Sequence, residues 1–312
     1  MIDKRDHMLS LLNGQRRADV IPAAFFLHFE PEEHFGQAAV EKHLEFFRYT
    51  DMDFSKIQYE RVFPKIEKIR QAKDWAQMPF YGLDFYEPQL SVVEGLVKAL
   101  KREALVIQTL YSPFMCAGHT VGQETLVRHI EEDPEAVTRG MQVITDSLMG
   151  FVKECIRLGV DGFYTSTQGG EAGRFSDPAL FGQCVRPYDL ALMEEIDRTC
   201  IFNILHICDY VMPYADIAQF VDYPGHVINT NLALTGKTLT PAEVEKMFGR
   251  PFMGGLDRLG VIAKGSEEKI LHAVDDALRM RSERFILGAD CTVPNDTPWD
   301  NLRTAIDRAH VV

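Results

Sequence analysis

The sequence contains no long apolar run, and no window approaches the roughly 18 residues that a transmembrane helix needs. Basic residues are few: 33 Lys and Arg stand against 46 Asp and Glu, which gives a net charge of −13. Such a surface repels the phosphates of nucleic acids and anionic membranes. The first residues form no apolar signal core. We therefore expect a cytoplasmic protein that binds neither nucleic acid nor membrane.

Motifs for several common functions are also missing. No GxGxxG, P-loop or GxSxG motif follows an apolar run, which leaves nucleotide binding and serine hydrolysis without support. The six cysteines are scattered along the chain and do not form a disulfide framework. Hydrophobic residues make up 46% of the 312 residues, and no linker divides them. We expect a single domain spanning residues 1–312.

The sequence does contain a recurring unit: a short apolar run, a polar turn and then an amphipathic segment. We interpret the apolar runs as strands, at Val20–Phe26, Phe54–Tyr59, Ala104–Leu110, Gly162–Thr165, Ile201–Ile207, His226–Asn231, Phe252–Leu256 and Phe285–Ala289. Continuous apolar runs are typical of parallel strands covered on both faces. Eight such units predict a single (β/α)8 TIM barrel, with a doubly wound open sheet as the alternative.

Helix starts are marked by an acceptor side chain followed by proline, at Asp133-Pro134, Asp177-Pro178, Thr240-Pro241 and Thr297-Pro298. Thr240 and Glu243 complete a capping box, and the acidic residues after Ser266 suit the start of another helix. Apolar residues at steps of three and four between residues 134 and 158 predict a helix with one buried face. The stretch Arg61–Gln89 has no clear period, and we expect an insertion over the barrel mouth.

One imidazole and two thiols fall at predicted strand ends. Residues two apart in a strand point to the same face, so His206 and Cys208 share one direction at the end of the fifth run. Cys291 follows the eighth run and would reach the same rim. This soft set suits Zn²⁺ with a fourth position left open. The alternative is a buried histidine and two unreactive core cysteines.

Other polar residues lie beyond predicted strands and are candidates for the same mouth: Gln168, Glu171, Asp257, His119, His28 and Glu30. Gln168 could orient a ligand, and Glu171 could occupy the open metal position when no thiol is bound. The alternative for both is an ordinary βα turn. Asp257 could anchor a ligand or simply pair with Arg258, and the three remaining residues could be structural.

At these positions the chain resembles the uroporphyrinogen decarboxylase superfamily. Residues 4–14 and 17–22 are similar to the opening helix and first strand of the family. Residues 255–257 with 265–268 resemble its Gly-Asn-Ile-Asp…Gly-Thr-Pro-Glu-Glu segment. Residues 285–288 with 294–298 and Asn301 resemble its closing signature. The resemblance extends over nearly the whole chain and implies a TIM barrel with an N-terminal helical extension.

The superfamily holds two chemistries. Its decarboxylases carry an Arg-rich run after the first strand, where this chain reads Phe25-Phe26-Leu27-His28-Phe29-Glu30-Pro31-Glu32-Glu33. Such an acidic loop would repel a substrate with many carboxylates. The late histidine of the decarboxylases is replaced too, near Asp290. The cobamide-dependent methyltransferase branch binds zinc through His-x-Cys and a distant Cys, which His206, Cys208 and Cys291 match; Asp209 departs from the usual glycine.

The resemblance to this branch implies a zinc-activated small-molecule thiol that receives a methyl group from methylcobalamin or a similar donor. No Asp-x-His-x-x-Gly cobalamin motif occurs, so a separate corrinoid protein would have to present the donor. Two alternatives remain open: a porphyrinogen decarboxylase, and a non-catalytic ligand-binding or zinc-storing relative.

Overall fold

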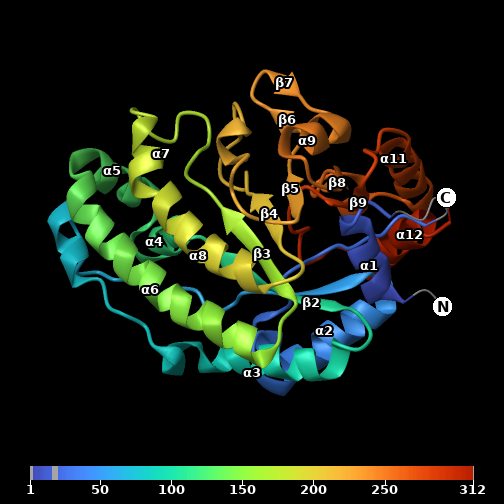
Figure 1. Cartoon of the computed structure of the whole chain (residues 1–312), viewed down its shortest axis with the longest axis horizontal. Helices are drawn as coiled ribbons and strands as arrows, with labels where there is room; N and C mark the ends of the chain where they lie inside the picture. The colour runs from blue at the N-terminus through green and yellow to red at the C-terminus, as the bar shows by residue number, and fades with distance from the viewer. Residues whose placement is uncertain (1–2, 16–19, 312) are drawn as a thin grey trace.

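The computed structural model describes residues 3–15 and 20–311. At its centre lies a parallel sheet of seven strands in the order β1-β2-β3-β4-β5-β8-β9. The strands are β1 (Phe54–Ile57), β2 (Leu105–Tyr111), β3 (Gly162–Thr167), β4 (Ile204–Ile207), β5 (Val227–Thr230), β8 (Phe252–Leu256) and β9 (Phe285–Ala289). A small antiparallel pair, β6 (Ala233–Leu234) and β7 (Lys237–Thr238), projects from the loop after β5 (Figure 1).

Helices follow the strands and surround the sheet (Figure 1). They are α1 (Lys4–Leu12), α2 (Gly36–Thr50), α3 (Leu83–Leu100), α4 (Pro113–Val121), α5 (Gln123–Glu132), α6 (Pro134–Leu158), α7 (Ala179–Cys184), α8 (Arg186–Thr199), α9 (Pro241–Phe248), α10 (Val261–Lys264), α11 (Glu267–Arg279) and α12 (Trp299–Ala309). Three short 3-10 turns, η1 (Pro31–Glu33), η2 (Ala72–Gln77) and η3 (Ala218–Phe220), complete the order. No described helix is long and apolar enough to cross a membrane.

The first predicted strand, Val20–Phe26, forms no regular strand but occupies the eighth position of the barrel. It makes one parallel bridge, Ala23 with Leu287 of β9. The backbone N–H of Ala24 donates to the Leu287 carbonyl at 3.0 Å, and the Leu287 N–H donates to the Pro22 carbonyl at 2.8 Å. Pro22 lacks an N–H, which limits ladder pairing here. The barrel is therefore closed rather than an open doubly wound sheet.

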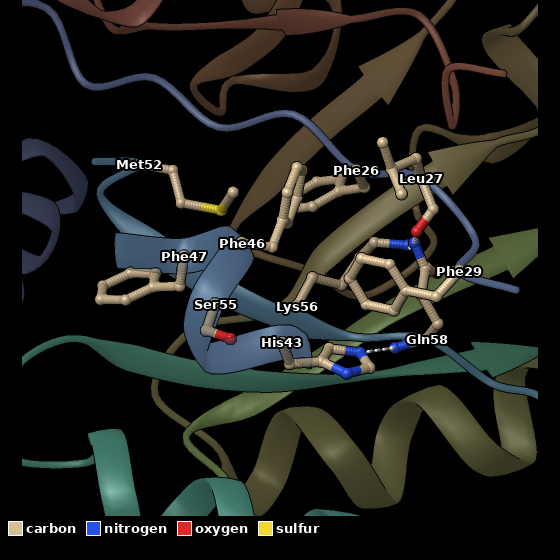
Figure 2. A pocket seen from close by; sticks show the side chains of 10 residues that line it. All are labelled: Phe26, Leu27, Phe29, His43, Phe46, Phe47, Met52, Ser55, Lys56 and Gln58. Carbon is tan, nitrogen blue, oxygen red and sulfur yellow. Dashed lines mark hydrogen bonds between the residues drawn. The ribbon is translucent and has the colours of Figure 1, made fainter. Parts of the chain in front are cut away.

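On its other side this segment is joined to β1 mainly through side chains. The Ala23 N–H donates to Asp53 Oδ2 at 2.7 Å, and the Asp53 N–H returns a bond to the Ala23 carbonyl at 3.0 Å. Gln58 Nε2 donates to the Leu27 carbonyl at 2.6 Å. Between these links lies a void of about 10 Å³, large enough for about one water molecule (Figure 2). Buried Asp53 and Gln58 thus replace part of a strand ladder.

The N-terminal helical extension, α1, covers the bottom of the barrel. The Arg5 guanidinium bonds both carboxylate oxygens of Asp161 at 2.8 Å, and Asp161 also accepts the backbone N–H of Val106. Asp161 directly precedes β3, so this ion pair fixes α1 against the N-terminal strand ends. Residues 17–19, which contributed to the resemblance, lie outside the described residues.

Two of the four predicted proline caps form as expected. Asp133 accepts the Ala136 N–H at the start of α6, and Thr240 and Glu243 form the capping box of α9. In the other two the helix begins one residue later than predicted, α7 at Ala179 and α12 at Trp299, so that the proline is the N-cap. The Asp177 side chain still accepts the Ala179 N–H at 2.9 Å, as predicted, whereas Thr297 caps no N–H that the structure describes. The Thr297 hydroxyl is buried and has no hydrogen-bond partner among the described residues, and the Thr297 backbone N–H closes a turn on the Pro294 carbonyl at 3.1 Å.

The long helix α6 has the predicted buried face, on which Val137, Met141, Ile144, Leu148, Phe151 and Cys155 are all fully buried. The insertion lies against this helix and α5. Trp75 of η2 packs over Gly140, where an added Cβ would come within 2.5 Å of the indole, and its Nε1–H donates to His129 at 3.2 Å. Residues 61–82 therefore flank the barrel at the side of α4–α6, and the last part of the predicted insertion is the start of α3.

We expect Asp53→Ala to destabilise the fold, since it removes the acceptor of the buried Ala23 N–H and of His310 Nε2, 2.9 Å away. The loss in free energy of unfolding should be about 2–3 kcal/mol, typical of a buried donor left unpaired. Urea denaturation measures it. The matched surface variant Asp307→Ala, which removes an exposed pairing with Arg303, should change stability little; equal losses in both would contradict the closing role of Asp53.

Candidate metal centre

Three side chains that the sequence singled out converge at the carboxyl end of the barrel. His206 lies in β4, Cys208 directly follows β4, and Cys291 is the second residue after β9. One ligand atom from each lies within 4.8 Å of the other two, and Cys291 Sγ is 3.3 Å from His206 Nε2. All three side chains are buried. Strands β4 and β9 are separated by β5 and β8 in the sheet, so curvature of the barrel brings the sulfurs together.

Neighbouring strands support the imidazole. The Tyr164 ring of β3 stacks on His206 with centroids 4.9 Å apart, and the Tyr164 hydroxyl donates to Asn229 of β5 at 2.5 Å. The Asn229 amide in turn donates to the carbonyls of Met253 and Ala289, each at 3.0 Å. His206 Nδ1 is buried and has no hydrogen-bond partner among the described residues. Stacking on Tyr164 and the contact of Nε2 with Cys291 Sγ therefore orient the ring, while Nδ1 contributes no hydrogen bond within the described part of the chain.

The donor set fits a soft divalent cation. The two thiols share a hydrogen bond, which lowers the pKa of Cys208 and raises that of Cys291. One thiolate therefore forms readily, and the second forms only at the cost of placing two negative charges side by side. A cation between them would remove that cost. One imidazole nitrogen and two sulfurs match the ligand chemistry of Zn²⁺ in sites that retain an open position.

The ligand set opens into the main cavity of the barrel, of about 680 Å³. Its wall includes Tyr111, Met115 and His119 on one side and Val293 and Asn295 on the other. Volumes of roughly 300–1,000 Å³ are typical of small-molecule sites. The three ligands thus face a space that accommodates a substrate.

Gln168 enters this cavity beside the metal ligands. Its Nε2 donates to Cys208 Sγ at 3.4 Å, and its Oε1 accepts from Gln123 Nε2 at 3.4 Å. Gln168 directly follows β3 and is buried. The structure therefore brings Gln168 to the ligand set, as the sequence predicted.

Glu171 does not reach the cluster. Its carboxylate is fully buried in an ion pair with Arg174, with contacts of 2.9 and 2.6 Å, and also accepts the Gly169 N–H at 2.8 Å. It is not among the cavity-lining residues. Both carboxylate oxygens are engaged, so the structure gives no support to Glu171 as the open-position ligand; the carboxylate instead fixes the loop after Gln168.

Asp257 is also outside the cavity, and the alternative, a pairing with Arg258, does not occur among the described residues. Asp257 is exposed and accepts the Leu259 N–H at 2.8 Å. Arg258 turns inward instead and bonds Asp209 at 3.0 Å and Asp290 at 2.7 Å. Arg258, rather than Asp257, is therefore the residue of this turn that faces the cavity.

Both histidines line the cavity. His119, on α4, has a pKa lowered by burial and by nearby Lys65, so it is neutral at physiological pH. His28 Nδ1 bonds Glu60 Oε1 at 2.7 Å. Glu30 lies beyond the cavity wall, in a side groove next to Asn295. His119 and His28 therefore line the cavity and Glu30 does not.

Lys56 is a cavity residue that the sequence analysis missed. It is buried on β1, where its Nζ donates to Gln58 Oε1 at 2.8 Å and lies 4.7 Å from the centroid of the Phe26 ring (Figure 2). The Tyr164 ring centroid also lies 4.7 Å from this Nζ. Burial lowers its pKa to about 7, against the opposing effect of Cys291 and Glu60. A charged residue inside an apolar strand run was the signal in the sequence.

Residues 52–312 match the family described as Uroporphyrinogen decarboxylase (URO-D). The chain belongs to this family. A curated relative, the methylated-thiol–coenzyme M methyltransferase of Methanosarcina mazei, is 24% identical over 234 residues, which cover 70% of this chain. The chain spans 57% of the length of that relative.

Solved structures show the same fold. A methyltransferase from Methanosarcina mazei superposes with a TM-score of 0.79 at 12% identity, covering 99% of this chain and 98% of that one. A B12-independent methionine synthase from a Shewanella species gives a TM-score of 0.56 at 13% identity, with 94% and 95% covered. At these identities the likeness establishes the TIM barrel.

Glu171→Gln should act on folding. It leaves the Arg174 guanidinium buried without a carboxylate, and the free energy of unfolding should fall by about 3 kcal/mol. The double variant Glu171→Gln/Arg174→Met should recover much of the loss in urea denaturation. Glu154→Gln, which breaks an exposed pairing with Arg157, serves as the surface control. An unchanged stability with weakened metal binding would instead favour a ligand role for Glu171.

Proposed function

We propose that this chain is a zinc-dependent methyltransferase that moves a methyl group from a methylated corrinoid, or a similar donor, to a small thiol. The observation that carries this proposal is the convergence of His206, Cys208 and Cys291 at an open cavity. The similarity of the chain to a methylated-thiol–coenzyme M methyltransferase supports methyl transfer as the reaction.

In this proposal His206, Cys208 and Cys291 hold the zinc, and the cavity supplies the open position. Bound zinc would lower the pKa of a substrate thiol and hold it as the nucleophilic thiolate at neutral pH. Gln168 donates a hydrogen bond to Cys208 Sγ and steadies that ligand. Tyr164 holds the imidazole plane. His119 and His28 line the same cavity and would contact the substrate.

The methyl donor would have to approach from outside the cavity. The thiolate sulfur gains the methyl carbon, and the bonding electron pair returns to the donor. No cobalamin motif occurs in the chain, so we assign presentation of the corrinoid to a separate protein. Tyr210, Val211 and Leu259 line the opening and are exposed, and they offer an apolar rim for such contact.

We expect about one zinc per chain in metal-replete protein, lost in Cys208→Ala and in Cys291→Ala because each removes one of three ligands. Cys184→Ala, at a buried cysteine on α7, is the matched control and should keep the metal. Elemental analysis measures the stoichiometry, and transfer of a methyl group from methylcobalamin to 2-mercaptoethanol measures the activity.

Unchanged zinc content in both ligand variants would exclude this site. Zinc lost in both, without methyl transfer to any thiol by the parent protein, would indicate the zinc-storing relative instead.

A porphyrinogen decarboxylase is the second candidate, favoured only by family membership. Among the described residues that line the cavity, Arg258 is the single arginine, and Asp209 and Asp290 neutralise it. The acidic segment with Glu30, Glu32 and Glu33 lies in the neighbouring groove. We expect no stepwise loss of carboxyl groups when uroporphyrinogen is incubated with the protein and the products are separated by chromatography; enzymatic loss would reverse the assignment.

Lys56 gives the cavity an unneutralised cation. Its hydrogen-bond partner is the neutral amide of Gln58, and two aromatic rings cover it. A buried ammonium of this kind is stabilised by an anionic group. We therefore propose that a thiol with an acidic end is preferred over a neutral one.

Lys56→Met should lower kcat/KM for 3-mercaptopropionate by about 10- to 100-fold, which is the range for one lost charged hydrogen bond. It should leave kcat/KM for the neutral thiol 2-mercaptoethanol nearly unchanged. The ammonium loses its proton as pH rises through about 7. The preference of the parent for the acidic thiol should therefore decline above that pH, and the variant should show no such decline. Equal effects on both thiols would contradict the role of Lys56.

A further inference from the structure

A chain of polar contacts crosses the carboxyl ends of β4, β5, β8 and β9, of which β4 and β9 carry the metal ligands. Asn231, after β5, donates to Asp209 Oδ2 at 2.7 Å, and Arg258, after β8, donates from Nη1 to Asp209 Oδ1 at 3.0 Å. Arg258 also reaches Asp290 after β9, from Nη1 to Oδ2 at 2.7 Å and from its backbone N–H to Oδ1 at 2.6 Å. The contacts therefore span from β4 to β9.

The two carboxylates in this chain are the immediate neighbours of the two cysteine ligands. Asp209 follows Cys208, and Asp290 precedes Cys291. Backbone ladders join β4 to β5, β5 to β8 and β8 to β9, but none joins β4 to β9 directly. Arg258 is thus a direct side-chain link between the segments that carry the two sulfurs.

Burial makes this link strong. Arg258 is 9% exposed and Asp290 6%. Without the guanidinium, two carboxylates and two sulfurs would face one another where water screens little, and like charges would drive the segments apart.

We propose that Arg258 is a positioning residue that sets the distance between Cys208 and Cys291 and so prepares the metal site before metal binds. It joins Asp209 to Asp290 by charge and geometry, and a planar guanidinium with several donors suits this task better than an ammonium. The hydrogen bonds of Arg258 go to the two carboxylates beside the cysteines rather than to the cysteines themselves. The inference rests on the proposed zinc site.

The test measures the zinc dissociation constant by competition with a chromophoric chelator. Arg258→Gln should raise the constant by about 10- to 100-fold, as loss of groups that orient metal ligands does. Arg258→Lys keeps the positive charge but loses the planar guanidinium that bonds both carboxylates. Its zinc dissociation constant should therefore lie between those of the parent and Arg258→Gln. Adding Asp209→Asn and Asp290→Asn to Arg258→Gln removes the repulsion and should restore most of the affinity.

The matched control is Arg250, at the opposite end of β8. It is bonded to the backbone carbonyls of Tyr223, Gly225 and Val221 and lies away from the cavity. Arg250→Gln should lower thermal stability and leave the zinc dissociation constant unchanged. The absorption spectrum of the Co²⁺-substituted protein provides a second readout, since a change in sulfur spacing in Arg258→Gln should alter its thiolate bands.

The outcomes separate the two proposals. If the parent binds zinc at the three ligands and Arg258→Gln binds it equally well, the positioning role is wrong and the proposed function stands. If the parent binds no zinc there, the proposed function fails and Arg258 has no site to prepare. If the triple variant Arg258→Gln/Asp209→Asn/Asp290→Asn binds zinc as weakly as Arg258→Gln alone, the loss of affinity comes from packing rather than from charge. That result would also overturn the positioning role.

Discussion

Closure of the barrel is the constraint on which the candidate site depends. Cys208 and Cys291 follow β4 and β9, which are not neighbours in the sheet, and their sulfurs fall within reach of one ion only because the sheet curls. The segment at residues 20–27 completes that curl with one ladder bridge on the β9 side and the Asp53 and Gln58 side chains on the β1 side. A stable barrel therefore precedes a competent metal site.

Charge is distributed unevenly over the barrel. The chain as a whole carries −13, yet the cavity holds two buried cations with opposite roles. Arg258 is neutralised by two carboxylates and acts within the protein, whereas Lys56 has only a neutral amide partner and remains available to a ligand. The acidic groove around Glu30 lies outside. This division suits a small thiol better than a porphyrin with many carboxylates.

The sequence predicted most of what repeating patterns and local chemistry determine. Apolar runs located seven strands, and the capping residues Asp133 and Thr240 located two helix starts, because such signals act over a few residues. His206 and Cys208 share a face through simple strand alternation. Cys291 could be added because parallel strands present their carboxyl ends at one rim.

What the sequence could not determine depends on partners far along the chain. Glu171 was a candidate for the open metal position, with an ordinary turn as the alternative, but Arg174 and the Gly169 N–H hold its carboxylate elsewhere. Asp257 was favoured over Arg258, although the turn after β8 points Arg258 toward Asp209 and Asp290. These outcomes follow from side-chain pairing in three dimensions, which strand periodicity does not encode.

The central claim is that Cys208, Cys291 and His206 bind zinc with one position free for a thiol. X-ray absorption at the zinc edge tests it most directly, because it counts sulfur and nitrogen neighbours of the metal. We predict two sulfur ligands per zinc in the protein alone and three after addition of a small thiol, with the nitrogen ligand retained. A sulfur count that stays the same when the thiol is added would contradict the account.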